Sequence, residues 1–243
     1  MIPGLVLVII HLAGAAHALK KGKDLWALAI ILFPFFALTA YLFRALGPDM
    51  RSDKDVLTEE ISPNQIPASP KVVRMLEEQV EINPSVQNKK NLADALVQQG
   101  NYRAAIDLYR SCLEGIYDND PAILYGYAIA SFLAGDYAET LALIERYQGA
   151  RGNNRQHQID LLKARTHQAL GDTDQALEIY QAIAGIYPGE EARYRYGLLL
   201  KESGNTQAAN QVFDELERNV KNSPEYYKDS QRRWISLTRK ARR

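Results

Sequence analysis

The 243-residue chain has one cysteine, Cys112, and four histidines. A single thiol excludes an internal disulfide framework, a zinc site of four cysteines and a redox Cys-x-x-Cys pair. No Ser/His/Asp arrangement, pair of carboxylates or metal-ligand spacing stands out in the sequence. We therefore expect no catalytic residues, no metal and no other cofactor, and we predict that the protein is not an enzyme.

The chain also lacks net charge, since 29 basic residues balance 29 acidic ones, but the charges are unevenly distributed. Residues 47–224 carry 18 basic and 26 acidic side chains, whereas residues 225–243 carry seven basic and two acidic. Binding to nucleic acid requires a broad basic face. We therefore expect no nucleic-acid partner, and anionic lipid is the possible ligand of the basic C-terminus.

Two runs without a charged side chain, residues 2–19 and 25–43, open the sequence. A helix needs roughly 20 apolar residues to cross the hydrocarbon of a bilayer. Each run is just long enough, and Trp26 and Tyr41 stand where aromatic rings favour the membrane interface. The sequence predicts a two-helix transmembrane anchor over residues 1–46, which would make the chain a multi-pass membrane protein.

A cleavable signal peptide is the competing interpretation, because Ala16-His17-Ala18 resembles the small-residue site of such segments. No basic stretch precedes the apolar core, however, and the second apolar run follows at once. We favour the retained anchor. Short basic loops tend to stay in the cytoplasm, so the inter-span lysines predict a cytoplasmic (inner) membrane protein with its remaining domain on the periplasmic face: Lys20, Lys21 and Lys23.

One stretch of this anchor is similar to the two-span N-terminal segment of cardiolipin synthases and related phospholipase-D-type enzymes. The similarity lies in His17-Ala18-Leu19-Lys20-Lys21-Gly22-Lys23-Asp24-Leu25-Trp26, then Leu32-Phe33-Pro34 and Tyr41-Leu42-Phe43. Those enzymes act through paired H-x-K-x4-D motifs, which this chain lacks. The resemblance implies a shared anchor without the catalysis.

A repeat follows the anchor and a Pro-containing linker over 47–70. Four turn pairs recur at intervals of 35, 36 and 33 residues: Gly100-Asn101, Gly135-Asp136, Gly171-Asp172 and Gly204-Asn205. Small residues stand seven before and five after each glycine: Ala93 with Ala105, Ala128 with Thr140, Ala164 with Ala176, and Gly197 with Ala209. Large residues four positions further on would fill the space between hairpins: Tyr109, Ile144, Tyr180 and Phe213. This pattern resembles the tetratricopeptide repeat, whose period is about 34 residues.

The resemblance implies an all-α fold, namely a solenoid of helical hairpins over residues 71–243. A helix over 71–83 precedes repeats near 86–120, 121–156, 157–189 and 190–223, and a capping helix over 224–243 follows them. The first helices are expected near 87–99, 121–134, 156–169 and 190–203, and the second helices near 102–116, 137–149, 173–186 and 206–221. Cys112 is expected to be a buried packing residue.

Such a solenoid offers a concave face lined by its first helices, which suits binding rather than catalysis. The groove positions of the family fall on Lys90, Asp94, Tyr125, Ile129, Phe132, Leu161, Arg165, Gln168, Tyr194, Leu198 and Lys201. Aromatic and arginine side chains predict a protein or peptide partner with an apolar anchor and acidic character. The leading hypothesis is a membrane-anchored scaffold of the bacterial envelope. The alternative is an accessory factor of phospholipid or cardiolipin metabolism that acts through its spans.

Overall fold

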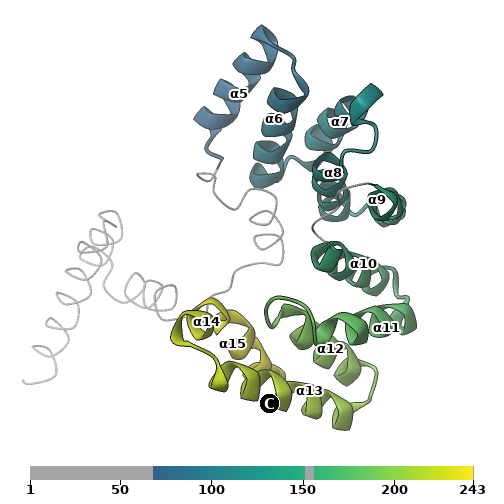
Figure 1. Cartoon of the computed structure of the whole chain (residues 1–243), viewed down its shortest axis with the longest axis vertical. Coiled ribbons are helices and arrows are strands. Elements are labelled where there is room, and N and C mark those ends of the chain that lie inside the picture. Colours follow the sequence, from purple (N-terminus) through teal and green to yellow (C-terminus); the bar gives the residue numbers. More distant parts are fainter. Residues whose placement is uncertain (1–67, 151–155, 243) are drawn as a thin grey trace, which may run out of the picture. The chain divides into compact units, whose positions relative to one another are not determined.

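The computed structural model describes residues 68–150 and 156–242. The predicted transmembrane anchor and nearly all of the predicted linker lie outside these residues. Within the two described ranges the chain forms helices and no strands (Figure 1). None of the helices described is both long and apolar enough to cross a membrane.

Four helical hairpins follow one another along the chain, in the order of the colours in Figure 1. They are α6 (Val86–Gln99) with α7 (Tyr102–Cys112), α8 (Pro121–Ala134) with α9 (Tyr137–Gly149), α10 (Gln156–Leu170) with α11 (Thr173–Ala184), and α12 (Glu191–Glu202) with α13 (Thr206–Asn222). The helix α5 (Pro70–Ile82) precedes them, and α14 (Glu225–Ser230) and α15 (Arg232–Ala241) follow.

The hairpins are joined by two kinds of contact. The second helix of each hairpin packs against the first helix of the next, as α7 on α8, α9 on α10 and α11 on α12. The first helices of the first three hairpins also contact each other, α6 with α8 and α8 with α10. This sequential packing of neighbouring hairpins confirms the predicted helical repeat architecture.

The recurring turn pairs explain why each hairpin reverses where it does. Gly100 and Gly135 have φ of 83° and 86°, in the left-handed region that glycine enters without strain. The amide of Gly100 donates to the Val97 carbonyl at 3.0 Å, and that of Asn101 donates to the Leu96 carbonyl at 2.9 Å. These two bonds form a Schellman ending that satisfies carbonyls left free at the helix C-terminus. The other three turn pairs repeat the same bonds.

The small residues at the predicted spacing lie where helices approach closely. Every member of the set is buried in the structure, as are the four large residues that follow. A Cβ added to Gly197 of α12 would lie 2.5 Å from Cε1 of Phe213 in α13, and one added to Gly126 of α8 would lie 2.8 Å from the ring of Tyr109 in α7. The predicted core of the repeats is therefore confirmed.

The predicted helix ends were less accurate for α7, for the cap and for α11, which ends at Ala184 instead of residue 186. The helix α7 ends at Cys112 instead of residue 116, because Gly115 takes a φ of 59° within a short 3-10 turn, η1 (Gly115–Tyr117). The predicted single capping helix is two short helices that meet at Gln231. The Gln231 side chain accepts a hydrogen bond from the Glu190 amide at 2.9 Å, which holds the junction against the start of α12.

Candidate binding groove

The predicted groove residues all lie on first helices, but they differ widely in exposure. Five are buried: Asp94, Tyr125, Ile129, Leu161 and Arg165. Five are half-buried, namely Lys90, Phe132, Gln168, Tyr194 and Leu198, and Lys201 is exposed. Their contact with a partner therefore stays a prediction whose plausibility differs from residue to residue.

Three of the buried residues, Tyr125, Ile129 and Leu161, belong to the core, and the last two are the most deeply buried. Ile129 has no exposed surface and Leu161 only 2%. Each packs within a cluster of other apolar side chains. A side chain covered on all sides cannot touch a partner in this structure, so we assign both residues to packing. The repeat period predicted the correct helix for each residue. It did not distinguish positions on the buried side of that helix from positions on its accessible side.

Asp94 is engaged by residues of its own repeat. It accepts a hydrogen bond from the Tyr109 hydroxyl at 2.5 Å and from Nζ of Lys90 at 2.8 Å. Burial, and next the negative charge of Asp94, raise the pKa of Tyr109 well above its ordinary value, so the phenol remains a neutral donor. The bond from Tyr109 of α7 to Asp94 of α6 connects the two helices of the first hairpin, and Lys90 pairs with Asp94 within α6.

At the fourth repeat, the C-terminal helix α15 covers two predicted positions. The ring of Tyr194 packs against that of Trp234, with centroids 5.5 Å apart. Lys201 donates a hydrogen bond from Nζ to the carbonyl of Ala241. A partner would have to displace α15 to reach the face of the Tyr194 ring that Trp234 covers, whereas Lys201 is exposed and only its ammonium group is bonded to α15.

Three predicted residues do converge on one open hollow of about 520 Å³, which we call the central hollow. Phe132 comes from α8, and Arg165 and Gln168 come from α10. The structure adds residues that sequence reasoning missed, above all Tyr137 of α9 and Arg195 of α12. Leu133, Ala134, Gly135 and Ala169 complete the lining.

The central hollow has two guanidinium groups that share one carboxylate. Nε of Arg195 lies 2.7 Å from Oε1 of Glu191, and Nη1 of Arg165 lies 3.6 Å from the same oxygen. Their side chains are 11% and 4% exposed, and that of Glu191 is 5% exposed. The three groups form a charged cluster in a poorly solvated place, where electrostatic interactions are stronger than in water.

Aromatic rings form the apolar part of the same hollow. Cζ of Arg165 lies 5.1 Å from the centre of the Phe132 ring, within range of a cation–π interaction. The Phe132 and Tyr137 rings lie 5.6 Å apart. Gln168 accepts a hydrogen bond from the Tyr180 hydroxyl at 2.9 Å, which orients its amide. The hollow can therefore hold an apolar side chain and an acidic group next to each other.

The missed residues carried a weak signal. Glu191 and Arg195 stand four residues apart, the spacing at which a glutamate pairs with a following arginine on one helix face. That spacing is common on solvated helices, so it does not by itself indicate a groove. Only the packing of α12 on the third hairpin brings Arg195 and Arg165 to the same carboxylate.

Other side chains in the described part of the chain offer little chemistry. No group of three His, Cys, Asp or Glu residues there could hold a metal ion. Cys112 is 1% exposed, as predicted, and burial raises the pKa of its thiol above the ordinary value. A protonated thiol is a weak nucleophile.

Stacked antiparallel hairpins with conserved turn geometry and a hollow on their first helices define a helical repeat protein of the binding type. The tetratricopeptide repeat family matches residues 90–155 and 161–224, more than half of the chain. The chain belongs to this family. No curated protein matches the chain.

Proposed function

We propose that this chain is a membrane-anchored adaptor that holds a segment of a protein partner in its central hollow. The observation that carries the proposal is the convergence of Phe132, Arg165 and Arg195, from three different first helices, on one open hollow. Tetratricopeptide repeats present such surfaces for protein interaction. Aromatic and arginine side chains are also the residue types that dominate binding energies at interfaces.

The chemistry of the hollow specifies the partner segment. The rings of Phe132 and Tyr137 suit an apolar side chain, while the guanidinium groups of Arg165 and Arg195 that line the same hollow suit an acidic neighbour. We therefore expect a short peptide or helix that carries one apolar anchor beside an acidic residue. Charge complementarity of this kind contributes mainly to specificity and to the rate of association.

The anchor in this proposal consists of the apolar runs over residues 2–19 and 25–43. Their length supports two spans of the cytoplasmic membrane, and the lysines between them support a periplasmic location for the repeats. The adaptor would then gather its partner at the outer face of that membrane.

A like charge placed in the hollow tests the proposal. In Gln168→Glu the new carboxylate keeps the size of the side chain and its ability to accept from Tyr180, but it repels an acidic segment. Crosslinking in native membranes, affinity purification and quantitative mass spectrometry should show at least a fivefold loss of the partner relative to the unchanged chain, which corresponds to about 1 kcal/mol.

The matched control is Gln181→Glu, the same change on the exposed surface of α11. It should leave recovery of the partner within twofold. Equal recovery with Gln168→Glu would show that the hollow does not bind the partner. If all three chains instead yielded a phosphatidyltransferase or cardiolipin in equal amounts, the alternative role in phospholipid metabolism would replace the adaptor.

A further inference from the structure

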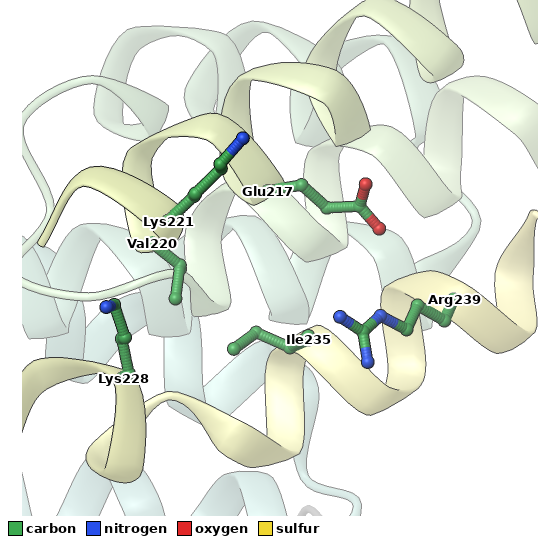
Figure 2. Close-up of a pocket in the computed structure, with 6 residues that line it drawn as sticks. All are labelled: Glu217, Val220, Lys221, Lys228, Ile235 and Arg239. Carbon is green, nitrogen blue, oxygen red and sulfur yellow. The ribbon is translucent and has the colours of Figure 1, made fainter. Parts of the chain in front are cut away.

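A second hollow, which we call the C-terminal pocket, lies where α13, α14 and α15 meet. It has a volume of about 390 Å³ and is lined by Glu217, Val220, Lys221, Lys228, Ile235 and Arg239. None of these residues contributes to the central hollow. Figure 2 shows Val220 and Ile235 pointing toward one another, with Lys228 and the guanidinium of Arg239 on either side of them.

The floor of the C-terminal pocket is apolar. Val220, on the last turn of α13, is 4% exposed, and Ile235 of α15 is half-buried. The two side chains leave a small aliphatic surface at the bottom of an open hollow. Covering such a surface with another apolar group is favourable, because it removes apolar area from water.

The rim of the pocket has an excess of positive charge. Its one carboxylate, Glu217, lies 3.2 Å from Nη1 of Arg242, and Lys228 lies 3.4 Å from Glu225. Among the residues that the structure describes, no carboxylate lies within ion-pair distance of Lys221 or Arg239. Two cations at the rim are therefore available for an anionic ligand.

A neighbouring hollow of about 400 Å³ extends the same basic surface. It shares Lys228, Ile235 and Arg239 with the C-terminal pocket and adds Arg232, Ser236 and Lys240 together with the carboxylates of Glu225 and Asp229. Arg232 is paired with Asp229 at 2.8 Å, whereas Lys240, like Lys221, has no acidic partner among the described residues. The cations thus form a surface broader than a single anion, with the apolar floor at its centre.

We propose that the C-terminal pocket binds the head group of an anionic phospholipid. The phosphate would lie between Lys221 and Arg239, and the first carbon atoms of the ester-linked chain would cover Val220 and Ile235. A phosphate diester only accepts hydrogen bonds, which matches a rim of amino and guanidinium donors. The excess positive charge adds attraction to an anionic membrane surface.

A lipid suits this pocket better than an acidic peptide does. All six lining residues lie in helices, so their amide N–H groups are bonded to carbonyls of the preceding turn, as that of Lys228 is to Pro224 and that of Ile235 to Gln231. An extended peptide would therefore find few partners for its own amide groups, and an unpartnered amide is costly. A lipid ester carries no amide groups that need such partners.

The inference does not depend on the central hollow, although the proposed anchor would keep lipid close by. Native mass spectrometry of the full chain in a neutral detergent tests it, with phosphatidylglycerol and phosphatidylcholine of identical acyl chains added in equal amounts. The unchanged chain should retain phosphatidylglycerol at least fivefold over phosphatidylcholine. Lys221→Gln with Arg239→Gln should lower that retention at least fivefold.

The matched control is Lys71→Gln with Arg74→Gln, which removes the same charge from exposed positions of α5. It should change retention by less than twofold. Lys221 and Arg239 are also exposed, so the paired substitution should leave the thermal midpoint unchanged. Lipid bound at the proposed spans would be retained by both double variants, so the difference between them isolates the pocket.

Three results would overturn the proposal. The first is equal retention of phosphatidylglycerol by the pocket variant and its control. The second is retention of inorganic phosphate as strong as that of the lipid, because the apolar floor would then have no role. The third is displacement of the lipid by an acidic hexapeptide containing one leucine. Gln168→Glu should leave lipid retention unchanged, which separates this outcome from the test of the central hollow.

Discussion

At the scale of single residues, Gly197 is the position where helix propensity and packing oppose each other most clearly. Alanine favours a helix interior by roughly 0.5–1 kcal/mol over glycine. In Gly197→Ala, however, the added Cβ would lie 2.5 Å from the fully buried ring of Phe213. Overpacking of this kind costs about 1–3 kcal/mol. We expect Gly197→Ala to lower the thermal midpoint, measured by circular dichroism.

Gly185→Ala is the control for that substitution. Gly185 follows α11 with a φ of −86°, and an added Cβ would meet no atom within 4 Å. We expect its thermal midpoint to stay equal or to rise slightly, because alanine restricts the unfolded chain more than glycine does. A midpoint for Gly197→Ala at or above that of Gly185→Ala would contradict the close approach of α12 and α13.

At the scale of elements, one buried carboxylate connects α14 and α13 with the start of α12. Glu190 has no exposed surface; it pairs with Arg193 at 3.0 Å and accepts from the Tyr227 hydroxyl at 2.9 Å and from the Asn219 amide at 2.5 Å. Burial, followed by the bond to Glu190, raises the pKa of Tyr227 to about 12, so its phenol is neutral at physiological pH. These bonds connect the start of α12 with α13 and α14.

We expect Glu190→Ala to loosen α14, whereas α15 keeps its own contacts through Trp234 and Arg242. Removing one partner from a buried charged cluster costs about 3 kcal/mol, which corresponds to a roughly hundredfold faster local exchange. Hydrogen exchange should show this loss of protection over residues 225–230, while α6 and α8 exchange as before. The exposed pair of Glu225 with Lys228 provides the control, since Glu225→Ala should change little.

The short C-terminal helices also show where sequence patterning stops being informative. The aromatic and basic residues over 224–243 predicted a cap, and Trp234 does pack against Tyr194. The break at Gln231 was not predicted, because it depends on a hydrogen bond to Glu190, 41 residues earlier in the chain. The spacing of apolar residues along the chain indicates which residues share one face of a helix. It contains no information on a contact between residues that lie in different helices.

At the scale of the whole molecule, the proposed anchor and the repeats should be separable. The hairpins of the described part bury their own core, so their folding does not require the apolar runs. We expect deletion of residues 2–46 to move the chain from the membrane to the soluble fraction with its helical circular dichroism intact. Recovery of the deleted chain in the membrane pellet after carbonate extraction would contradict an anchor in residues 1–46.

The proposed orientation is tested by reporter fusions to the full chain. Two reporters are fused after Arg243 of the full chain, one that is active only in the periplasm and one that is active only in the cytoplasm. We expect the periplasmic reporter to be active, because the basic loop between the apolar runs favours the cytoplasm. Activity of the cytoplasmic reporter instead would place the repeats on the inner face. That result would change the location of the adaptor and leave the binding chemistry of the central hollow as it is.

The sequence by itself determined the repeat. The repeat depends on glycine turns, on small residues at facing points and on one large residue per hairpin. These features act over short distances along the chain, so their spacing predicted both ends of each first helix to within one residue. Tertiary structure alone decided which side chains remain accessible. Stacking buried Ile129, brought Arg195 to Arg165, and placed α15 over Tyr194 and beside Val220. Accessibility depends on residues from other hairpins, and their arrangement in space is not contained in a local period.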